Sequence, residues 1–294
     1  MPSNSQHLDL AGVTAVNPKE GGEARASGTR EGVSLACHGG SGTAPSVSFD
    51  PSARTWAGIQ GGVAIGAMLE AAGGFLNGRI PVAATTHFHA PISPGSAQLS
   101  VSVQAKSRTL SSAKVTLNQA RPGATMTALF TDPGSRPEAL HWLQTGPTQE
   151  ELRRPPESLP AFPAPVDVVP ISRHFDIRPL GSGRPLAGGA TPHLRAWIRY
   201  AAGSHPTSSI PVVLDALFPS IYATRKHPQP MPTAEMTIHF AQPTQVTEWL
   251  LIDQRTAWSW PGLCVDDCEL WTSDGNLVAH ARQTRRMLED RPAR

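Results

Sequence analysis

Two almost entirely apolar stretches, one in each half of the chain, constrain the fold more than any other feature of this sequence. The first, residues 63–76, reads VAIGAMLEAAGGFL and carries Glu70 as its single charge. The second, residues 206–223, reads PTSSIPVVLDALFPSIYA and carries only Asp215. A helix that is apolar all round must be buried on every side. Both stretches are therefore predicted to be buried helices, and Pro219 is expected to kink or end the second.

Strand-like segments follow each predicted helix, and a further one, residues 193–200, precedes the second helix. Several short segments have strand-like composition or alternate polar and apolar residues, and the segments are joined by connections too short for a parallel sheet. They span residues 81–92, 97–106, 112–119 and 124–131 in the first half, and 193–200, 232–242, 247–256, 264–272 and 276–287 in the second. We predict an α+β protein of two antiparallel sheets, each wrapped around a long central helix and packed side by side. Two unrelated α+β domains are the alternative, which the repeated lone carboxylate disfavours.

The domain boundaries follow from composition. Residues 1–30 are rich in Ser, Gly, Glu and Ala without periodicity, and we expect a flexible lead-in. Residues 144–171 are rich in proline, which predicts an extended linker. The two repeated units are then residues 31–143 and 172–294. A length of 294 residues agrees with two domains of ordinary size.

Charge and cysteine content exclude several classes of protein. The net charge is +2 without a dense basic stripe, so no nucleic-acid partner is expected. The pair Arg285-Arg286 is predicted to be solvated surface. Three cysteines, Cys37, Cys264 and Cys268, form neither a disulfide framework nor a zinc site, so we expect no metal. With no signal peptide or membrane-length apolar segment, the expected location is the cytoplasm, away from any membrane.

Asp215 is the first candidate for chemistry. Apolar neighbours on its helix would keep the carboxylate from bulk water, and a buried carboxylate is costly unless it is hydrogen-bonded or used. The structural alternative is an Asp that caps a neighbouring loop, and the sequence favours the two interpretations about equally. Glu70 has the same form and is the rival acid. The pair Gly61-Gly62 stands where the first helix begins, so its N–H groups could bind an oxyanion, although such pairs are usually just tight turns.

Two strands could supply partners to Asp215. Thr233, Glu235, Thr237 and His239 are expected on one face of their strand. In the last strand, Gln283 shares a face with two alanines, which suits close packing on a helix with the amide pointing inward. A Thr and a Gln directed at one buried Asp would satisfy it and leave an oxygen free to hold a water. The motifs GxSxG, GxGxxG, HExxH and the P-loop are missing from the sequence.

The sequence resembles acyl-CoA thioesterases of the thioesterase II type, which are double hotdog proteins. The resemblance covers about residues 45–290 and is carried by WAGIQGGVAIGAMLEAA, THFHAPISPG, FDIRP, WIR, TAEMTIHFAQP and DGNLVAHARQ, together with the lone Asp of the second helix. In that family a helix Asp, a strand Thr and a last-strand Gln hold the attacking water. The resemblance therefore implies that Asp215, Thr233 and Gln283 are catalytic, with Gly61 and Gly62 as candidates for binding the carbonyl oxygen.

The resemblance also implies the substrate and assembly. An acyl-CoA would be hydrolysed without any cofactor beyond the CoA of the substrate, and a homodimer or higher oligomer is expected. An enoyl-CoA hydratase with the same fold is one alternative, but such enzymes resemble one another in an Asp followed five residues later by His. That position is Ser220 after Asp215 and Phe75 after Glu70. A non-catalytic acyl-CoA-binding or assembly protein is the other alternative, which would not need a buried acid.

Overall fold

The computed structural model describes residues 13–14, 45–135, 146–201, 205, 207–242, 246 and 248–289. Apart from Val13 and Thr14, the predicted lead-in of residues 1–30 lies outside the described residues, as does Cys37.

Strands contain far more residues of the described chain than helices do. The strands are β1 (Val13–Thr14), β2 (Ser46–Phe49), β3 (Ile80–Phe88), β4 (Gly95–Lys106), β5 (Leu110–Asn118), β6 (Pro122–Thr131), β7 (Phe175–Leu180), β8 (His193–Tyr200), β9 (Thr233–Phe240), β10 (Leu250–Trp260), β11 (Leu263–Thr272) and β12 (Leu277–Arg286). The α-helices are α1 (Gly61–Gly74), α2 (Gln149–Arg153) and α3 (Ile210–Leu214). Short 3₁₀ helices are η1 (Pro51–Ala53), η2 (Pro133–Ser135), η3 (Pro156–Ser158), η4 (Pro170–His174), η5 (Thr207–Ser209) and η6 (Ser220–Thr224).

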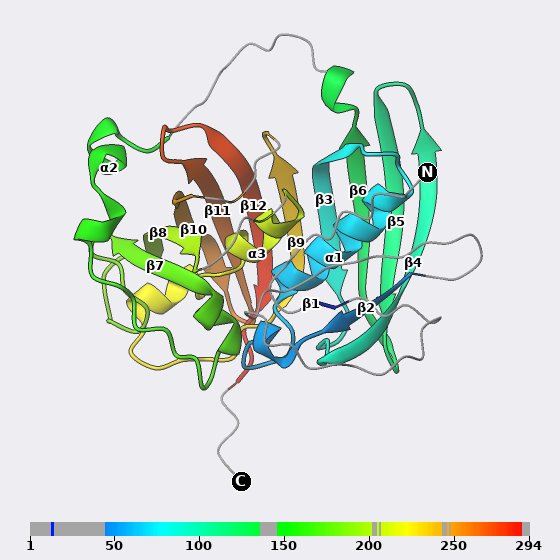
Figure 1. Cartoon of the computed structure of the whole chain (residues 1–294). Coiled ribbons are helices and arrows are strands. Elements are labelled where there is room, and N and C mark those ends of the chain that lie inside the picture. Colours follow the sequence, from blue (N-terminus) through cyan, green and yellow to red (C-terminus); the bar gives the residue numbers. More distant parts are fainter. Residues whose placement is uncertain are drawn as a thin grey trace, which may run out of the picture.

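All twelve strands form one antiparallel sheet, in the order β1-β2-β4-β5-β6-β3-β9-β12-β11-β10-β8-β7. This corrects the prediction of two separate sheets, because β3 and β9 are hydrogen-bonded to each other at the centre. Thr85 and Thr237 lie opposite one another in this pairing, and their hydroxyl oxygens are 3.0 Å apart. The two halves of the chain are thus joined by backbone hydrogen bonds along the middle of the sheet (Figure 1).

The strand order repeats on the two sides of this central pair. Outward from β3 the first half runs β6, β5, β4 and β2, and outward from β9 the second half runs β12, β11, β10 and β8. In each half, the strand that follows the helix in sequence lies at the centre of the sheet. The remaining strands of that half then follow outward in the corresponding order. The predicted repeat of helix and strands is visible in this arrangement, with β1 and β7 added at the two edges.

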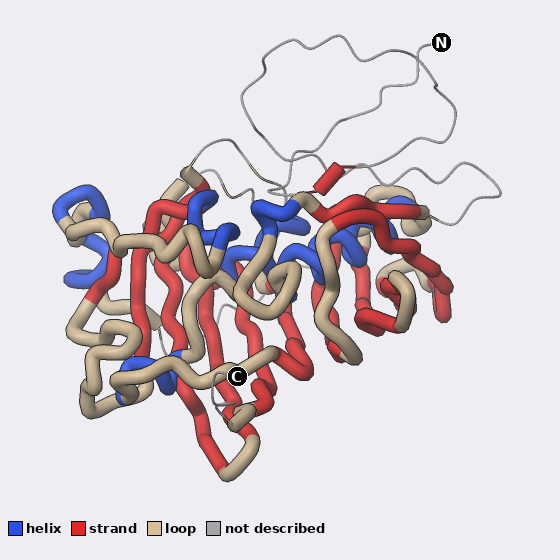
Figure 2. The backbone as a smooth tube through the Cα atoms, turned by 90° about the horizontal axis from the view of Figure 1, so that it is seen from below, coloured by secondary structure: helices blue, strands red, loops and turns tan. Residues whose placement is uncertain are grey.

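The helix α1 is buried as its composition predicts. Ten of its fourteen residues are buried, and it contacts β3, β4, β5 and β6. Helices α1 and α3 lie on the same face of the sheet (Figure 1), and Figure 2 shows most helical segments gathered along one side of the row of strands. None of the helices in the described part of the chain is long and apolar enough to cross a bilayer.

The second helix differs from the prediction of a long central element. α3 covers only five residues, and Asp215 is its C-terminal cap. The chain then continues through an irregular turn into η6, which begins immediately after Pro219. Most apolar residues of the predicted helix are still buried, in α3 and η6, whereas residues 216–218 in the turn between them are half-buried. Hydrophobicity predicted the burial here, whereas proline limited the length of the helix.

The proline-rich segment predicted as an extended linker is partly ordered against the sheet. It contains α2, which begins with a capping box formed by Thr148 and Glu151. Leu159 is buried in a small cluster with Trp197 and Trp271, which is separate from the main core beneath α1 and α3. The segment therefore contributes a second apolar layer over the C-terminal half of the sheet.

A close contact between α1 and α3 brings the two halves together on the helical face. At Gly62 a Cβ atom would lie 2.2 Å from the carbonyl oxygen of Pro211, well inside contact distance. Only glycine allows the first turn of α1 to approach the α3 backbone this closely. Gly73, near the other end of the same helix, has no atom within 4 Å of its Cβ position.

The substitution Gly62→Ala should therefore destabilise the protein, by about 3 kcal/mol, because neither backbone can yield freely. Gly73→Ala is the matched control and should stabilise the protein by up to about 1 kcal/mol, since alanine is the better helix former. Urea unfolding of both variants measures the difference. Equal stabilities for the two variants would contradict the close contact at Gly62.

Candidate active site

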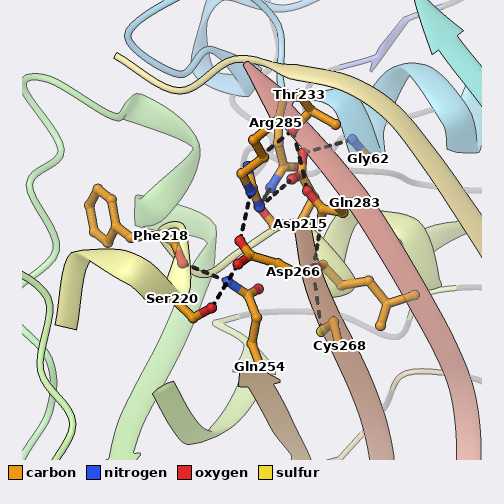
Figure 3. Close-up of polar contacts among 12 residues, drawn as sticks. Gly62, Asp215, Phe218, Ser220, Thr233, Gln254, Asp266, Cys268, Gln283 and Arg285 are labelled. Atoms are coloured by element: carbon orange, nitrogen blue, oxygen red, sulfur yellow. Dashed lines mark hydrogen bonds and ion pairs between the residues drawn. The ribbon is translucent and has the colours of Figure 1, made fainter. Parts of the chain in front are cut away.

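The candidate site lies where the first turn of α1 meets the end of α3. The backbone N–H of Gly62 donates a hydrogen bond to Oδ2 of Asp215 at 3.1 Å. Gln60, which precedes α1, donates from Nε2 to the carbonyl oxygens of Val212 and Asp215, at 3.2 and 2.9 Å. Residues from the first half of the chain thus position both the backbone and the side chain of the predicted acid (Figure 3).

Two further predicted residues lie at this carboxylate. Gln283 on β12 is fully buried, and its amide Nε2 lies 3.4 Å from the carbonyl oxygen of Leu214, directly before Asp215. The Gln283 side chain also acts to lower the pKa of Asp215. Thr233 at the start of β9 donates from its hydroxyl to Oε1 of Gln283 at 3.3 Å. The structure therefore brings Asp215, Thr233 and Gln283 together from three elements.

A register shift turns Thr233 toward the site. Regular alternation would place Thr233 on the same face as Glu235, as the sequence predicted. Instead the pairing of β9 with β12 shifts between Thr284 and Arg285, so that Thr233 lies opposite Arg285. Glu235 bonds to Thr284 on the other face, while Thr233 bonds to Gln283. The prediction that Thr233 and Glu235 share a face is wrong, because a β-bulge separates them.

Arg285 corrects a second prediction. It was expected on the solvated surface, yet its side chain is only 6% exposed. Its Nε donates to Oδ2 of Asp266 at 2.9 Å, and its Nη1 donates to the hydroxyl oxygen of Thr233 at 3.0 Å. Its Nη2 lies 3.9 Å from Oδ1 of Asp215. A buried guanidinium is retained only where carboxylates compensate its charge, and here two carboxylates are within reach.

Burial raises the pKa of Asp215 above its ordinary value. The positive charge of Arg285 opposes this effect, as do hydrogen bonds from the Gly62 backbone, the Gln283 side chain and the Gly61 backbone. The side chain retains 10% exposure, so it is not completely sealed from solvent. An acid with a raised pKa and a limited opening is suited to accepting a proton from a water.

Glu70 lies away from this cluster. It is eight residues after Gly62 on α1, which corresponds to about 12 Å along the helix axis. Its pKa is also raised by burial, with the Ser208 side chain acting in the opposite direction. The rival acid therefore belongs to a different part of α1 and does not contribute to the Asp215 cluster.

The Gly61-Gly62 pair is at the start of α1, as predicted, but its N–H groups face the protein's own acid. The Gly62 amide donates a hydrogen bond to Asp215, and the Gly61 amide also acts to lower the pKa of this carboxyl. A substrate carbonyl oxygen would have to compete with this carboxylate for them. The helix N-terminus in this arrangement therefore stabilises the negative charge of Asp215, which is the effect expected of a helix dipole on a nearby anion.

The described side chains include no group of three or more His, Cys, Asp or Glu that could hold a metal ion. Cys264 and Cys268 are fully buried, and burial raises the pKa of both thiols. Both thiols therefore remain protonated, and Cys268 lies beneath the site with its sulfur 3.7 Å from the carbonyl oxygen of Leu214.

Sequence reasoning missed three residues of the site. The sequence could have indicated Arg285, since it lies two residues after Gln283 on the same strand. Strand alternation therefore places it on the same inward face as Gln283. Gln60 precedes the glycine pair directly, but nothing in the sequence predicts that its amide reaches α3. Asp266 and Asp267 are adjacent acids in β11, and only the tertiary structure distinguishes the fully buried Asp266 from its neighbour.

Comparisons with known protein families match both halves of the chain. A family model described as the acyl-CoA thioesterase N-terminal domain matches residues 51–131, and one described as the acyl-CoA thioesterase C-terminal domain matches residues 153–287. No curated protein matches the chain at a significant level.

Solved structures share the fold at low sequence identity. A conserved protein of unknown function with a hot dog fold from Alicyclobacillus acidocaldarius aligns with a TM-score of 0.75 and 22% identity, covering 88% of this chain and 97% of that one. A putative thioesterase II from Thermobifida fusca aligns with a TM-score of 0.68 and 22% identity, covering 83% of this chain and 92% of that one. An acyl-CoA thioesterase II from Mycobacterium marinum aligns with a TM-score of 0.63 and 18% identity, covering 78% of this chain and 88% of that one. The chain therefore has a hot dog fold.

The raised pKa of Asp215 predicts a cost in stability. A carboxyl whose pKa is higher in the folded state than in the unfolded state loses its favourable contribution as pH rises through the folded value. Asp215→Asn should therefore raise the melting temperature at pH 7, and the gain should shrink as the pH falls toward about 4, where the unfolded Asp is itself protonated. Thermal unfolding across this pH range tests it, and a gain that does not depend on pH would contradict it.

Proposed function

The chain belongs to the acyl-CoA thioesterase family, and on that premise we propose that it hydrolyses acyl-CoA thioesters to a free carboxylic acid and CoA. The observation that carries the proposal is the Asp215 carboxylate, which is buried to 10% exposure, bonded to the N-terminus of α1 and followed in space by Gln283 at the adjacent Leu214 carbonyl. A protein that only bound acyl chains would gain nothing from a carboxylate held at this cost.

In the proposed reaction Asp215 is the general base. Its Oδ2 is occupied by the Gly62 N–H, which leaves Oδ1 to accept a proton from a water. The water oxygen attacks the thioester carbonyl carbon and gives a tetrahedral intermediate. The carbon–sulfur bond then breaks, its electron pair goes to sulfur, and the proton held by Asp215 passes to the departing thiolate to give CoA.

Thr233 and Gln283 would position the acid and the water. Gln283 directs its amide N–H groups toward Asp215 and the adjacent carbonyl of Leu214 because Thr233 donates to its oxygen. This arrangement keeps donors around the carboxylate while it is charged. The proposed hydrolysis uses a water, a base and these donors, and it calls for no metal or cofactor besides the CoA of the substrate.

We further propose that each half of the chain is one hotdog unit and that the protein is a double hotdog. The mirrored strand order on either side of β3 and β9 supports this division, with α1 as the helix of the first unit and α3 with η6 as the reduced helix of the second. The site would then be shared, since Gly62 comes from one unit and Asp215 from the other.

Replacing Asp215 by Asn should lower kcat by about 10²- to 10⁴-fold, the contribution typical of a general base, without unfolding the protein. Thiol release from acyl-CoAs of short to long chain measures the turnover. Glu70→Gln is the matched control, a buried acid of the same helix pair that should leave kcat within a few-fold of wild type.

Two outcomes would contradict the proposal. Wild-type turnover in the Asp215→Asn variant, combined with loss in Glu70→Gln, would transfer the role of base to Glu70. A folded wild-type protein that binds the panel of acyl-CoAs and releases no thiol would identify a binding protein instead.

A further inference from the structure

Arg285 is a charged side chain that the proposed hydrolysis does not explain. It stands at the end of β12 with 6% exposure, and the cost of burying it is large unless each donor is used. Its guanidinium makes two hydrogen bonds, to Asp266 and to Thr233. Its Nη2 has no hydrogen-bond partner among the described residues and lies 3.9 Å from Oδ1 of Asp215, the oxygen that Gly62 leaves free.

Asp266 holds Arg285 from behind. This carboxylate on β11 is fully buried, and its Oδ1 accepts hydrogen bonds from the hydroxyls of Ser220 and Thr256, at 2.8 and 2.9 Å. Its Oδ2 accepts from Nε of Arg285. Every oxygen of Asp266 is thus engaged, and the groups that engage it come from η6, β10 and β12. The carboxylate is an anchor for the guanidinium (Figure 3).

Arg285 fixes which group donates and which accepts in each hydrogen bond between it and the site. A guanidinium can only donate, so its Nη1 fixes Thr233 as an acceptor. The hydroxyl hydrogen of Thr233 then donates to Oε1 of Gln283, and the Gln283 amide N–H groups point to Leu214 and Asp215. The orientation of both predicted positioning residues follows from the donor at Arg285.

The charge of Arg285 also acts on Asp215 directly. At 3.9 Å the two groups are too far apart for a hydrogen bond but close enough for a strong Coulomb attraction in a buried site. Within the described part of the chain, the other groups around Asp215 add no second positive charge. α1 contributes backbone amides, with Glu70 about 12 Å further along; β9 contributes Thr233; and β11 contributes Asp266 and the protonated thiol of Cys268.

We propose that Arg285, anchored by Asp266, is a positioning residue that orients Thr233 and Gln283 and, through its charge, sets how readily Asp215 accepts the proton of the attacking water. This inference rests on the proposed hydrolysis. Asp266 compensates most of the Arg285 charge, so that Asp215 is kept as a carboxylate without being made too weak a base.

The test is the pH dependence of kcat for acyl-CoA hydrolysis in Arg285→Gln and Arg285→Lys. Loss of the charge in Arg285→Gln should move the acid limb to higher pH, because the largest effect that opposes burial at Asp215 is then removed. Its kcat at the high-pH plateau should also fall, up to about a hundredfold, since the site geometry is released. Arg285→Lys should return the acid limb toward wild type while its plateau stays low, because lysine restores the charge without the two-pronged contact.

Arg282→Gln is the matched control on the same strand. Arg282 is 56% exposed and pairs with Asp267 on the opposite face, so its loss should leave both the acid limb and the plateau unchanged. If Arg285→Gln fails to fold because Asp266 is left unpaired, the double variant Asp266→Asn/Arg285→Gln removes both charges. Its acid limb should still move to higher pH, but by less than in Arg285→Gln, because loss of the Asp266 charge offsets part of the effect.

A second readout does not require turnover. The carboxyl carbon of Asp215, labelled with ¹³C and assigned by its loss in Asp215→Asn, should titrate at higher pH in Arg285→Gln than in wild type. Unchanged titration and an unchanged acid limb in a folded Arg285→Gln variant would overturn the inference. Full activity in Asp215→Asn would instead overturn the role of Asp215 as the base, on which this inference rests, and the Arg285 variants would distinguish the two failures.

Discussion

The hydrogen bond from the Gly62 N–H to Asp215 is the interaction on which the rest of the site depends. It joins the start of α1, in the first half of the chain, to the end of α3, in the second half. It exists only because residue 62 has no side chain, so that the two backbones can approach. The amide Nε2 of Gln60 strengthens the same junction by bonding to two carbonyl oxygens of the α3 end. Neither half of the chain alone could provide all the contacts of the Asp215 carboxylate.

The continuous sheet beneath the helices explains why the junction is fixed. β3 and β9 follow the two helices in sequence and pair with each other, so the relative position of α1 and α3 is set by backbone hydrogen bonds. The buried charges then balance within this frame. Asp215 and Asp266 lie on either side of Arg285, and hydroxyl, amide and backbone donors supply the remaining contacts. Burial favours a neutral Asp215, and these contacts favour its charged form, which leaves an acid able to exchange a proton.

The sequence predicted the repeated layout, burial of the two apolar stretches and the meeting of Asp215, Thr233 and Gln283. Those features depend on hydrophobic pattern and on resemblance to a family. It did not predict that the two sheets are one, because edge pairing between β3 and β9 leaves no compositional mark. The length of α3 was also missed, since apolar residues stay buried whether or not the backbone remains helical.

The inward turn of Thr233 and the burial of Arg285 illustrate a further limit. Strand alternation predicts faces only while the register is regular, and the β-bulge at the start of β9 breaks it for Thr233. Arg285 was expected in solvent because arginine usually is, and only its contact with Asp266 shows why it is buried. In both cases the deciding partner is on another strand, distant in sequence.

The claim that a water held at Asp215 is the nucleophile can be measured in a single turnover in H₂¹⁸O with enzyme in excess over acyl-CoA. Direct attack by water predicts ¹⁸O in the released acid and none in the protein. Incorporation of ¹⁸O into the Asp215 carboxylate, detected by mass spectrometry of its peptide, would show that the carboxylate itself attacks the thioester. That result would contradict the account of Asp215 as a general base.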